Sequence, residues 1–238
     1  MSRLAGSSAL QRIVSRLLGR TPPVSLGDLR RVTPLSREFG FDRGAPVDRR
    51  YIEGFLTRHA GDIRGRVLEV KDAAYTRRFG GARVEVSDVL DVDPTNPDAT
   101  LIDDLTTGAL LPSDAFDCIV LTQTLHLIFD VHAAARTLHR VLKPGGVLLL
   151  TVPGITQIPR AESSYWYWSF SSLAADRLFR GTFVDGTVDV ASHGNVLAAT
   201  AFLYGLAERE LRDEELDAND PDYPVTITVR AVKAPRAT

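Results

Sequence analysis

The sequence has little cysteine and no long hydrophobic run. Cys118 is the only cysteine in 238 residues, so an intrachain disulfide framework cannot form. It lies in the apolar run "FDCIVL", where we expect a buried structural thiol rather than a nucleophile. No apolar run approaches the roughly 18 residues that a membrane span requires. This cysteine usage favours a reducing cytoplasm.

The sequence also lacks an excess of either charge. It has 28 Lys and Arg against 30 Asp and Glu, which gives a net charge of −2. A chain without a basic excess is not expected to bind nucleic acid as its main ligand. The single cysteine and the scattered histidines lack the spacing of metal ligands, so we expect no metal site. With 44% hydrophobic residues, the chain is long enough for one large domain.

The first 45 residues differ from the rest. Apolar residues recur at helical spacing in "SALQRIVSRLLGR" and predict an amphipathic helix, followed by a proline-rich wrapping segment. We expect this helix to pack on the body of the protein or on a protein partner; contact with a membrane surface is the weaker alternative. Residues 46–238 are then the main domain.

From residue 47 onward, helical and strand-like segments alternate. Apolar strands are expected at 66–70, 82–90, 99–105, 116–125 and 146–154, and helices at 47–61 and 130–142. Asp48 is placed to cap the first of these helices. A tail of strand (187–195), helix (196–211), acidic loop (212–222) and strand (223–234) follows. Near-continuous apolar strands that alternate with helices predict an α/β fold, with a largely parallel sheet covered on both faces.

Glycine is missing where such a fold needs it most. In "RVLEVKDAAYTRRFGG", a strand ends at Glu69, and the loop that follows contains Lys71, Asp72 and Ala73 instead of glycines. Ligands of open α/β sheets bind outside the carboxyl ends of the strands. An acid about 20 residues beyond the first loop can bind a ribose diol, and Asp88 fits that role. The alternative is that Asp88 caps a turn.

Several segments in this order resemble the class I S-adenosylmethionine (SAM)-dependent methyltransferase family, over about residues 43–233. The segments are "FDRGAPVDRRYIEGFL", "VLEV", "VEVSDVL", "DDL", "FDCIVLTQTLHLI", "LHRVLKPGGVLLLTVPG" and "YWYWSFSSLAADRLF". The helix–turn–strand segment with "KPGG" is the most specific of them. The aromatic segment is similar to that of members acting on sugars and glycans.

The resemblance implies a Rossmann-like, doubly wound sheet of seven strands, mostly parallel with an antiparallel last strand. It also implies SAM as the cofactor. The residues that match the cofactor-binding positions are Glu69, Val70, Lys71, Asp72, Ala73, Asp88, Val89, Asp103, Asp104, Leu105, Thr122 and Gln123.

The chain departs from this family at two glycine positions, which Lys71 and Ala73 occupy. SAM carries a sulfonium cation, and an ammonium about 6 Å away would cost about 2–3 kcal/mol at an effective dielectric constant near 20. This repulsion is avoided if Lys71 points to solvent or pairs with Asp72 or Glu69. The alternative is a fold that no longer transfers methyl groups, either as a non-catalytic partner subunit or as an enzyme that binds an anionic ligand near Lys71.

Methyl transfer to a hydroxyl requires a base near the end of the fourth strand. His126 is the candidate, because histidine titrates near neutrality; a histidine bound to backbone at a helix start is the alternative. Four aromatic residues follow the fifth strand. We expect Tyr165, Trp166 and Tyr167 to cover the acceptor, and Trp168 to belong to the core. Arg43 and His193 are further candidates for acceptor binding.

These observations predict a SAM-dependent methyltransferase that acts on oxygen. Its expected acceptor is a small metabolite or a sugar of a glycan or natural product.

Overall fold

The computed structural model describes residues 25–236, which fall into two units. The first unit is Met1–Thr33, and its described part contains one 3₁₀ turn, η1 (Gly27–Arg30). The amphipathic helix that we expect near residues 10–20 lies outside the described residues. The second unit is Pro34–Thr238, and it contains all the other helices and strands of the described chain.

The second unit is built on a seven-stranded sheet with the strand order β3-β2-β1-β4-β5-β7-β6. Pairing is parallel from β3 through to β5, whereas β7 runs antiparallel to both of its neighbours. This confirms the predicted Rossmann-like sheet. The strands are β1 (Gly65–Val70), β2 (Val84–Asp91), β3 (Leu101–Ile102), β4 (Phe116–Thr122), β5 (Leu142–Pro153), β6 (Thr187–His193) and β7 (Thr226–Val232).

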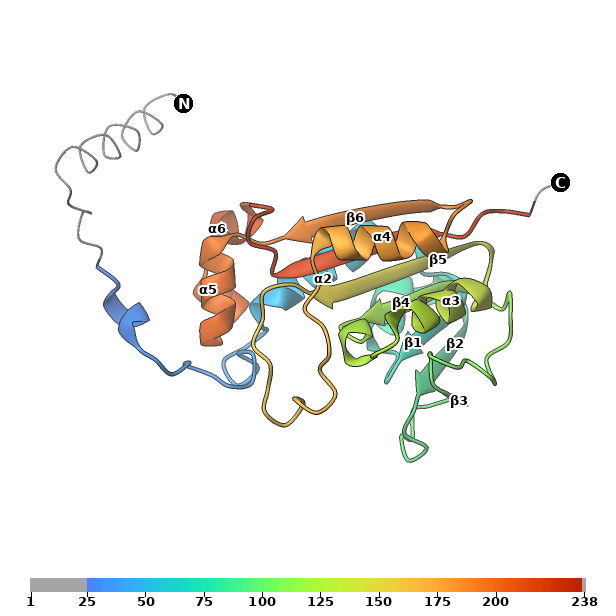
Figure 1. Ribbon diagram of the computed structural model, residues 1–238, viewed down its shortest axis with the longest axis horizontal. Helices are drawn as coiled ribbons and strands as arrows, with labels where there is room; N and C mark the ends of the chain where they lie inside the picture. Colours follow the sequence, from blue (N-terminus) through green and yellow to red (C-terminus); the bar gives the residue numbers. More distant parts are fainter. Residues whose placement is uncertain (1–24, 237–238) are drawn as a thin grey trace, which may run out of the picture. The chain divides into compact units, whose positions relative to one another are not determined.

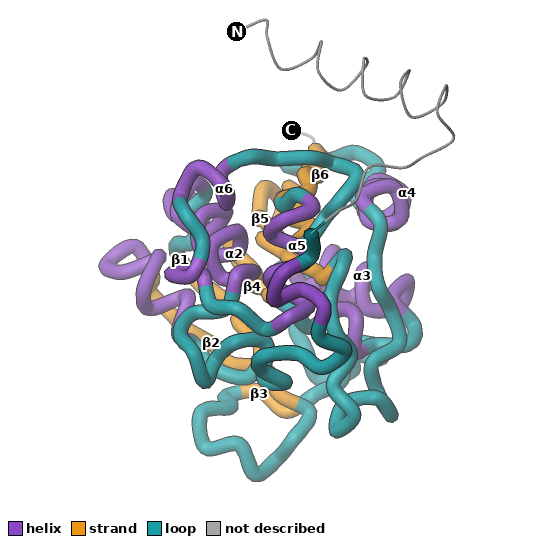
Figure 2. Tube along the Cα trace, turned by 90° about the vertical axis from the view of Figure 1, so that its left-hand side faces the viewer, coloured by secondary structure: helices purple, strands orange, loops and turns teal. Residues whose placement is uncertain are grey.

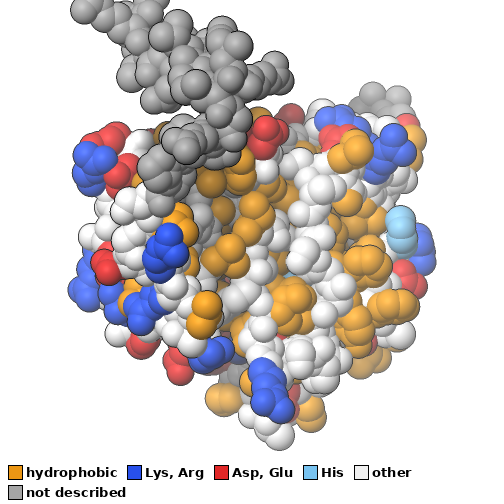
Figure 3. All heavy atoms as spheres, turned by 60° about the vertical axis from the view of Figure 1, so that its left-hand side comes forward, with side chains coloured by type: hydrophobic (Ala, Val, Ile, Leu, Met, Phe, Trp, Pro, Cys, Tyr) orange, Lys and Arg blue, Asp and Glu red, His pale blue; other side chains and the backbone are white. Residues whose placement is uncertain are grey.

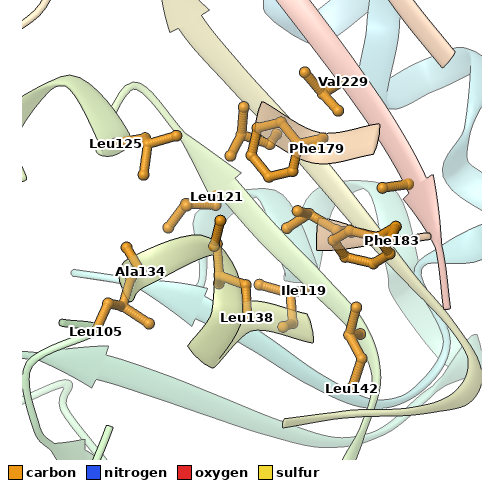
Figure 4. Packing of buried hydrophobic residues seen from close by; sticks show 14 of the residues in the cluster. Leu105, Ile119, Leu121, Leu125, Ala134, Leu138, Leu142, Phe179, Phe183 and Val229 are labelled. Atoms are coloured by element: carbon orange, nitrogen blue, oxygen red, sulfur yellow. The ribbon is translucent and has the colours of Figure 1, made fainter. Parts of the chain in front are cut away.

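Helices cover both faces of the sheet (Figure 1). On one face, α3 (Val131–Val141) and α4 (Ser172–Thr182) form the larger core with β4, β5 and β7. In that core, Leu138 and Phe179 point toward the strand residues Ile119 and Val229 (Figure 4). On the other face, α2 (Val47–Arg58) packs on β1, β4 and β5. Each helix buries its apolar stripe, which is why the helical spacing in the sequence located them.

A third cluster lies beyond the sheet. It joins the start of α2 to α5 (Val196–Tyr204) and to α6 (Asp213–Asp217). The acidic stretch that we expected as a loop therefore contains a short helix, because Leu216 is buried in this cluster.

One predicted helix end and one predicted helix cap were wrong. The helix expected to reach residue 211 ends at Tyr204, because Gly205 takes a left-handed conformation with φ of 73° and closes it. A Cβ at Gly205 would lie 2.4 Å from the Ser36 carbonyl oxygen, so a larger residue does not fit. Asp48 does not cap α2: the helix begins one residue earlier, and burial raises the pKa of the Asp48 carboxyl.

Connections set the shape of the sheet's carboxyl edge. The short link between β1 and β2 contains a π-helical turn at Thr76–Gly80 and a 3₁₀ turn at Gly81–Arg83. The expected third strand is reduced to the two residues of β3.

Within residues 25–236, no helix has the length and apolar character needed to cross a bilayer.

Candidate active site

Predicted site residues gather where the parallel strands end. β1 lies between β2 and β4, so the strand order reverses at this point. The arrows of β5 and β6 point to the same side in Figure 1, and Figure 2 shows loops crowded on that side. In open α/β sheets this edge is where ligands bind.

Lys71 occupies the first position after β1 with the backbone of a glycine. Its φ is +76°, in the left-handed region that side chains other than glycine rarely adopt. Its N–H donates to the Leu90 carbonyl at 2.9 Å, and its own carbonyl accepts from Asn96 Nδ2 at 2.7 Å. Lys71 is exposed, and among the described residues it forms no ion pair. The lysine therefore keeps the turn expected for the family and leaves its ammonium in solvent.

Glu69 holds the rest of this loop in place. It is only 4% exposed, and its two carboxylate oxygens accept the backbone N–H groups of Tyr75 (3.1 Å) and Thr76 (2.7 Å). Burial raises the pKa of this carboxyl, and the bonds from Thr76 and Tyr75 act in the opposite direction. The Asp72 carboxylate accepts from Ala74 N at 2.7 Å, and Ala73 is buried. Glu69 thus anchors the first turn after the strand.

The acid at the end of β2 is not the one we expected. Asp88 lies within the strand opposite Leu68, where Arg66 Nε donates to its carboxylate at 2.7 Å. Asp91 ends the strand three residues later, and its carboxylate accepts from Asn96 Nδ2 at 2.6 Å. Asp91 therefore has the position for which Asp88 was proposed. Val89 lies opposite Glu69 and is buried.

The two acids after β3 bind backbone N–H groups of their own loop. One Asp103 oxygen accepts from Leu110 N at 2.7 Å and from Leu111 N at 3.1 Å. The Asp104 carboxylate accepts from Thr106 N at 2.7 Å, but the residue is exposed. Leu105 is buried in the larger core. Of the three, Asp104 is the most open to a ligand.

Gln123 marks the end of β4 with a second unusual backbone. Its φ is +45°, and its N–H donates to the Thr151 carbonyl at 2.9 Å. Thr122 pairs with Thr151 in the last register of β4 and β5. This bend turns the chain out of the sheet and toward His126.

His126 is the buried middle residue of the 3₁₀ turn η5 (Leu125–Leu127). Its ring centroid lies 4.2 Å from that of Trp166. Burial lowers the pKa of His126 to about 4, so the imidazole is neutral at pH 7. Among the described residues, His126 Nδ1 and Trp166 Nε1 are both buried without a hydrogen-bond partner. Unsatisfied polar atoms in two neighbouring rings are costly, and they make this position a candidate functional site.

The chain segment 154–170, called here the aromatic loop, lies on η5. The His126 carbonyl accepts the N–H groups of Tyr167 (3.0 Å) and Trp168 (3.2 Å). Trp166 stacks on Phe39 with centroids 6.4 Å apart. Trp166 and not Trp168 is thus the inward-facing tryptophan, which corrects our expectation; Trp168 is 38% exposed and stacks on Phe129.

Tyr165 and Tyr167 are also exposed, as is Phe129. Figure 3 shows hydrophobic side chains across much of the face that it brings forward. No charged residue occurs between Glu162 and Asp176 in the sequence.

Two predicted acceptor residues have other contacts. Arg43 forms a two-pronged ion pair with Glu210, with Nε at 2.9 Å from Oε2. His193 ends β6, where Nε2 lies 3.0 Å from Thr228 Oγ1 and the ring stacks on Tyr51. It lines a separate cavity of about 510 Å³ together with Tyr51 and Arg58. Both side chains are thus engaged by other described residues.

The structure therefore brings the turn at Lys71, the carboxylates of Glu69 and Asp91, and the bend at Gln123 to one sheet edge, with His126 and Trp166 beside them. Sequence reasoning missed Asp91 and Phe39. The strand register could have indicated Asp91, whereas nothing in the sequence pairs Phe39 with Trp166. Within residues 25–236, no three His, Cys, Asp or Glu side chains group as a metal site.

Comparison with known proteins agrees with this geometry. Residues 35–188 match the family described as "Methyltransferase domain". That match spans more than half of the sequence, and the chain belongs to this methyltransferase family, with SAM as the cofactor of its class.

Solved structures share the fold at low sequence identity. An S-adenosylmethionine-dependent methyltransferase from Mesorhizobium loti has a TM-score of 0.53 at 18% identity, covering 80% of this chain and 99% of its own. The N-methyltransferase NodS from Bradyrhizobium japonicum WM9, in complex with S-adenosyl-L-homocysteine, has a TM-score of 0.52 at 14% identity. The match covers 82% of this chain and 90% of NodS. The [4+2]-cyclase SpnF has a TM-score of 0.51 at 16% identity, and the match covers 79% of this chain and 82% of SpnF.

A curated relative matches over a shorter stretch. The ubiquinone/menaquinone biosynthesis C-methyltransferase UbiE of Pectobacterium atrosepticum is 39% identical over 62 residues. The match covers 26% of this chain and about a quarter (25%) of that protein.

Proposed function

We propose that this protein transfers a methyl group from SAM to a hydroxyl of a small metabolite or of a sugar. The observation that carries the proposal is the aromatic loop. It closes over the neutral His126 at the carboxyl end of β4, whose Nδ1 has no hydrogen-bond partner among the described residues. Aromatic faces suit stacking on sugar rings and apolar acceptors. A loop that contributes large aromatics to the ligand-binding edge supports an acceptor lid.

The residues at the edge fit the cofactor. The left-handed Lys71 backbone reproduces the turn that glycine supplies in the family, and the lysine side chain is exposed rather than buried in the site. We assign the ribose hydroxyls to Asp91 in place of Asp88, because Asp88 is bound by Arg66 within the sheet. The loop from Glu69 to Ala73 and the exposed Asp104 complete the cofactor side, with Thr122 and Gln123 at the methyl.

When bound, SAM supplies an activated methyl group on a sulfonium. The task of the chain is to place the acceptor oxygen in line with that methyl and to remove the hydroxyl proton. His126 accepts this proton at Nδ1, which has no partner among the described residues. A ring with a pKa of about 4 is neutral but weakly basic. Lifting Trp166 from it would rehydrate the ring and restore its basicity.

His126 is only 2% exposed, so the aromatic loop must move before an acceptor can reach it. The loop is attached to η5 by the two bonds to the His126 carbonyl and by the bond from Trp168 Nε1 to the Ile128 carbonyl (3.0 Å). These few contacts are consistent with a segment that opens for the acceptor and closes during transfer.

Calorimetric titration with SAM and with S-adenosylhomocysteine tests the cofactor assignment. We expect micromolar binding of both, and a loss of at least tenfold for Asp91→Ala, since a bidentate acid–diol contact is removed. Asp88→Asn serves as the control and should bind both within about twofold, because its carboxylate contacts Arg66 and Thr100. Equal loss in both variants would contradict the assignment to Asp91. No heat from either ligand would reject methyl transfer.

One observation favours a second function. Lys71 presents an ammonium that no described acid pairs at the turn beside the site, and the [4+2]-cyclase SpnF shows that this fold occurs in a protein named for a different reaction. Under this alternative, Lys71 binds an anionic ligand. Lys71→Gly separates the two: it should keep or improve SAM binding in a methyltransferase, and it should abolish anion binding or create SAM binding in the alternative.

A further inference from the structure

A groove between α3 and α4 lies outside the candidate active site. The two helices cover the same face of the sheet, and the groove between them has a volume of about 410 Å³. His132, Arg136 and His139 reach it from α3 at i, i+4 and i+7, and Arg177 and Gly181 reach it from α4 at i and i+4. Residues at these spacings share one side of a helix. None of the described residues that line the groove is an acid.

The two arginines of the groove differ from their neighbours. Arg140 donates to the carbonyls of Leu111 (2.8 Å) and Gly108 (2.6 Å). Arg180 pairs with Asp176 at 2.7 Å. In the part of the chain that the structure describes, Arg136 and Arg177 form neither an ion pair nor a side-chain hydrogen bond, and both are exposed. Two guanidinium groups that serve no described internal contact are available to a ligand.

The remaining lining residues add donors and space. His139 packs its ring edge-on against Phe183, with centroids 4.8 Å apart. Burial, and then Lys233, lowers the pKa of His139, so at neutral pH its ring offers one N–H donor without a charge. A Cβ added at Gly181 would meet no atom within 4 Å, and the residue has no left-handed φ. The groove is therefore open at Gly181 and can be filled there without backbone strain.

We propose that this groove binds the phosphate group of a phosphorylated small molecule. Two guanidinium groups match a dianion, and a phosphate monoester carries nearly two negative charges at neutral pH. The planar fork of arginine recognises phosphate oxygens in pairs. The volume falls in the range of small-molecule sites, which favours a metabolite over free phosphate. This inference does not depend on the proposed methyl transfer.

Calorimetric titration at low salt with glucose 6-phosphate, inorganic phosphate and glucose tests the proposal on the full chain. We expect the two phosphates to bind, the sugar phosphate more tightly, and glucose not to bind. Arg136→Ala with Arg177→Ala should weaken the sugar phosphate at least about tenfold. The charge-matched control, Arg64→Ala with Arg209→Ala, removes two exposed guanidinium groups elsewhere and should change it less than about twofold.

Gly181→Phe provides a second, steric variant, which should weaken the sugar phosphate to a similar extent while thermal unfolding shows an intact fold. The proposal is overturned if neither phosphate binds at millimolar concentration, or if the arginine double variant binds like the control. Tighter binding of inorganic phosphate than of the sugar phosphate would overturn the assignment to a metabolite.

Discussion

Two loops at the same sheet edge are built in opposite ways. The loop after β1 is short and charged, and backbone bonds hold it: Glu69 accepts two of its N–H groups, and Lys71 is bound through its own N–H and carbonyl. The aromatic loop after β5 is long and carries no charge from Ser163 to its end at Phe170, and it attaches through rings and through three bonds to the carbonyls of His126 and Ile128. The first loop fixes a backbone shape, whereas the second presents side chains.

This difference explains how the first loop tolerates the loss of glycine. The turn needs a left-handed residue and two satisfied amides, and the chain meets both needs with Lys71 and Glu69. The aromatic loop has no such fixed requirement, since its contacts depend on which rings it carries. The first loop is thus defined by its backbone geometry, and the aromatic loop by the side chains that it presents.

The largest effect should come from removing the anchor of the first loop. Glu69→Ala leaves the buried N–H of Thr76 and the partly buried N–H of Tyr75 without an acceptor. We expect the free energy of unfolding to fall by about 3 kcal/mol, at about 1.5 kcal/mol for each bond to a charged group. Urea unfolding measures this change. Glu53→Ala, which removes a partly exposed ion pair with Arg78, should cost less than about 1 kcal/mol; equal losses would show that Glu69 is no special anchor.

We expect low pH to destabilise the packing of the aromatic loop on His126. The folded pKa of His126 is about 4 and that of free histidine about 6.5. The unfolded chain therefore binds more protons between these values, and stability is full above pH 6.5 and declines as pH falls toward 4. At pH 5 the loss from this group is about 2 kcal/mol.

The two tryptophans of the chain both lie in the aromatic loop, so Trp168→Phe leaves Trp166 as a single reporter over His126. We expect its emission to shift as the pH falls toward 4, and His126→Asn to remove both this shift and the matching part of the stability loss. His193→Asn is the matched control, because burial lowers its pKa to about 4 as well, in a different cavity. Persistence of the shift in His126→Asn would refute the assignment.

The smallest effect concerns Lys71. Lys71→Gly relieves the strain of a left-handed backbone at a residue with a side chain, although glycine also increases the conformational entropy of the unfolded chain. We therefore expect the free energy of unfolding to rise by about 0.5–1 kcal/mol. Lys71→Ala removes the same charge but keeps the left-handed backbone, and it should gain nothing. Thermal or urea unfolding of the pair distinguishes strain from charge: a similar gain in both variants would exclude strain as the cause.

The sequence predicted the sheet because that information is local and repeated. Apolar strands and amphipathic helices each carry their own pattern, and the antiparallel last strand followed from the family resemblance. Segment ends were less certain. The apolar pattern of α5 continues past Gly205, although the left-handed backbone of this glycine ends the helix.

The candidate site was predicted in part for the same reason. Glu69 and Lys71 follow a strand directly, so their place at the edge could be inferred. The choice between Asp88 and Asp91 depended on the register of β1 and β2, which alternation alone does not determine in a buried strand. That Trp166 and not Trp168 faces inward depends on its stacking with Phe39, which only the fold brings near.

The base of the aromatic loop is fastened at both ends. Phe170 N donates to the Pro153 carbonyl at 3.0 Å, and Gly154 and Ile155 donate to the carbonyls of Val225 and Pro224. A Cβ at Gly154 would lie 2.3 Å from the Pro224 oxygen. The first residue of the loop is therefore packed closely against the segment that leads into β7. We expect insertions, deletions and exchanges between these two fastenings to leave the sheet unchanged. Under the proposed function, the segment that binds the acceptor can therefore vary without a change in the sheet.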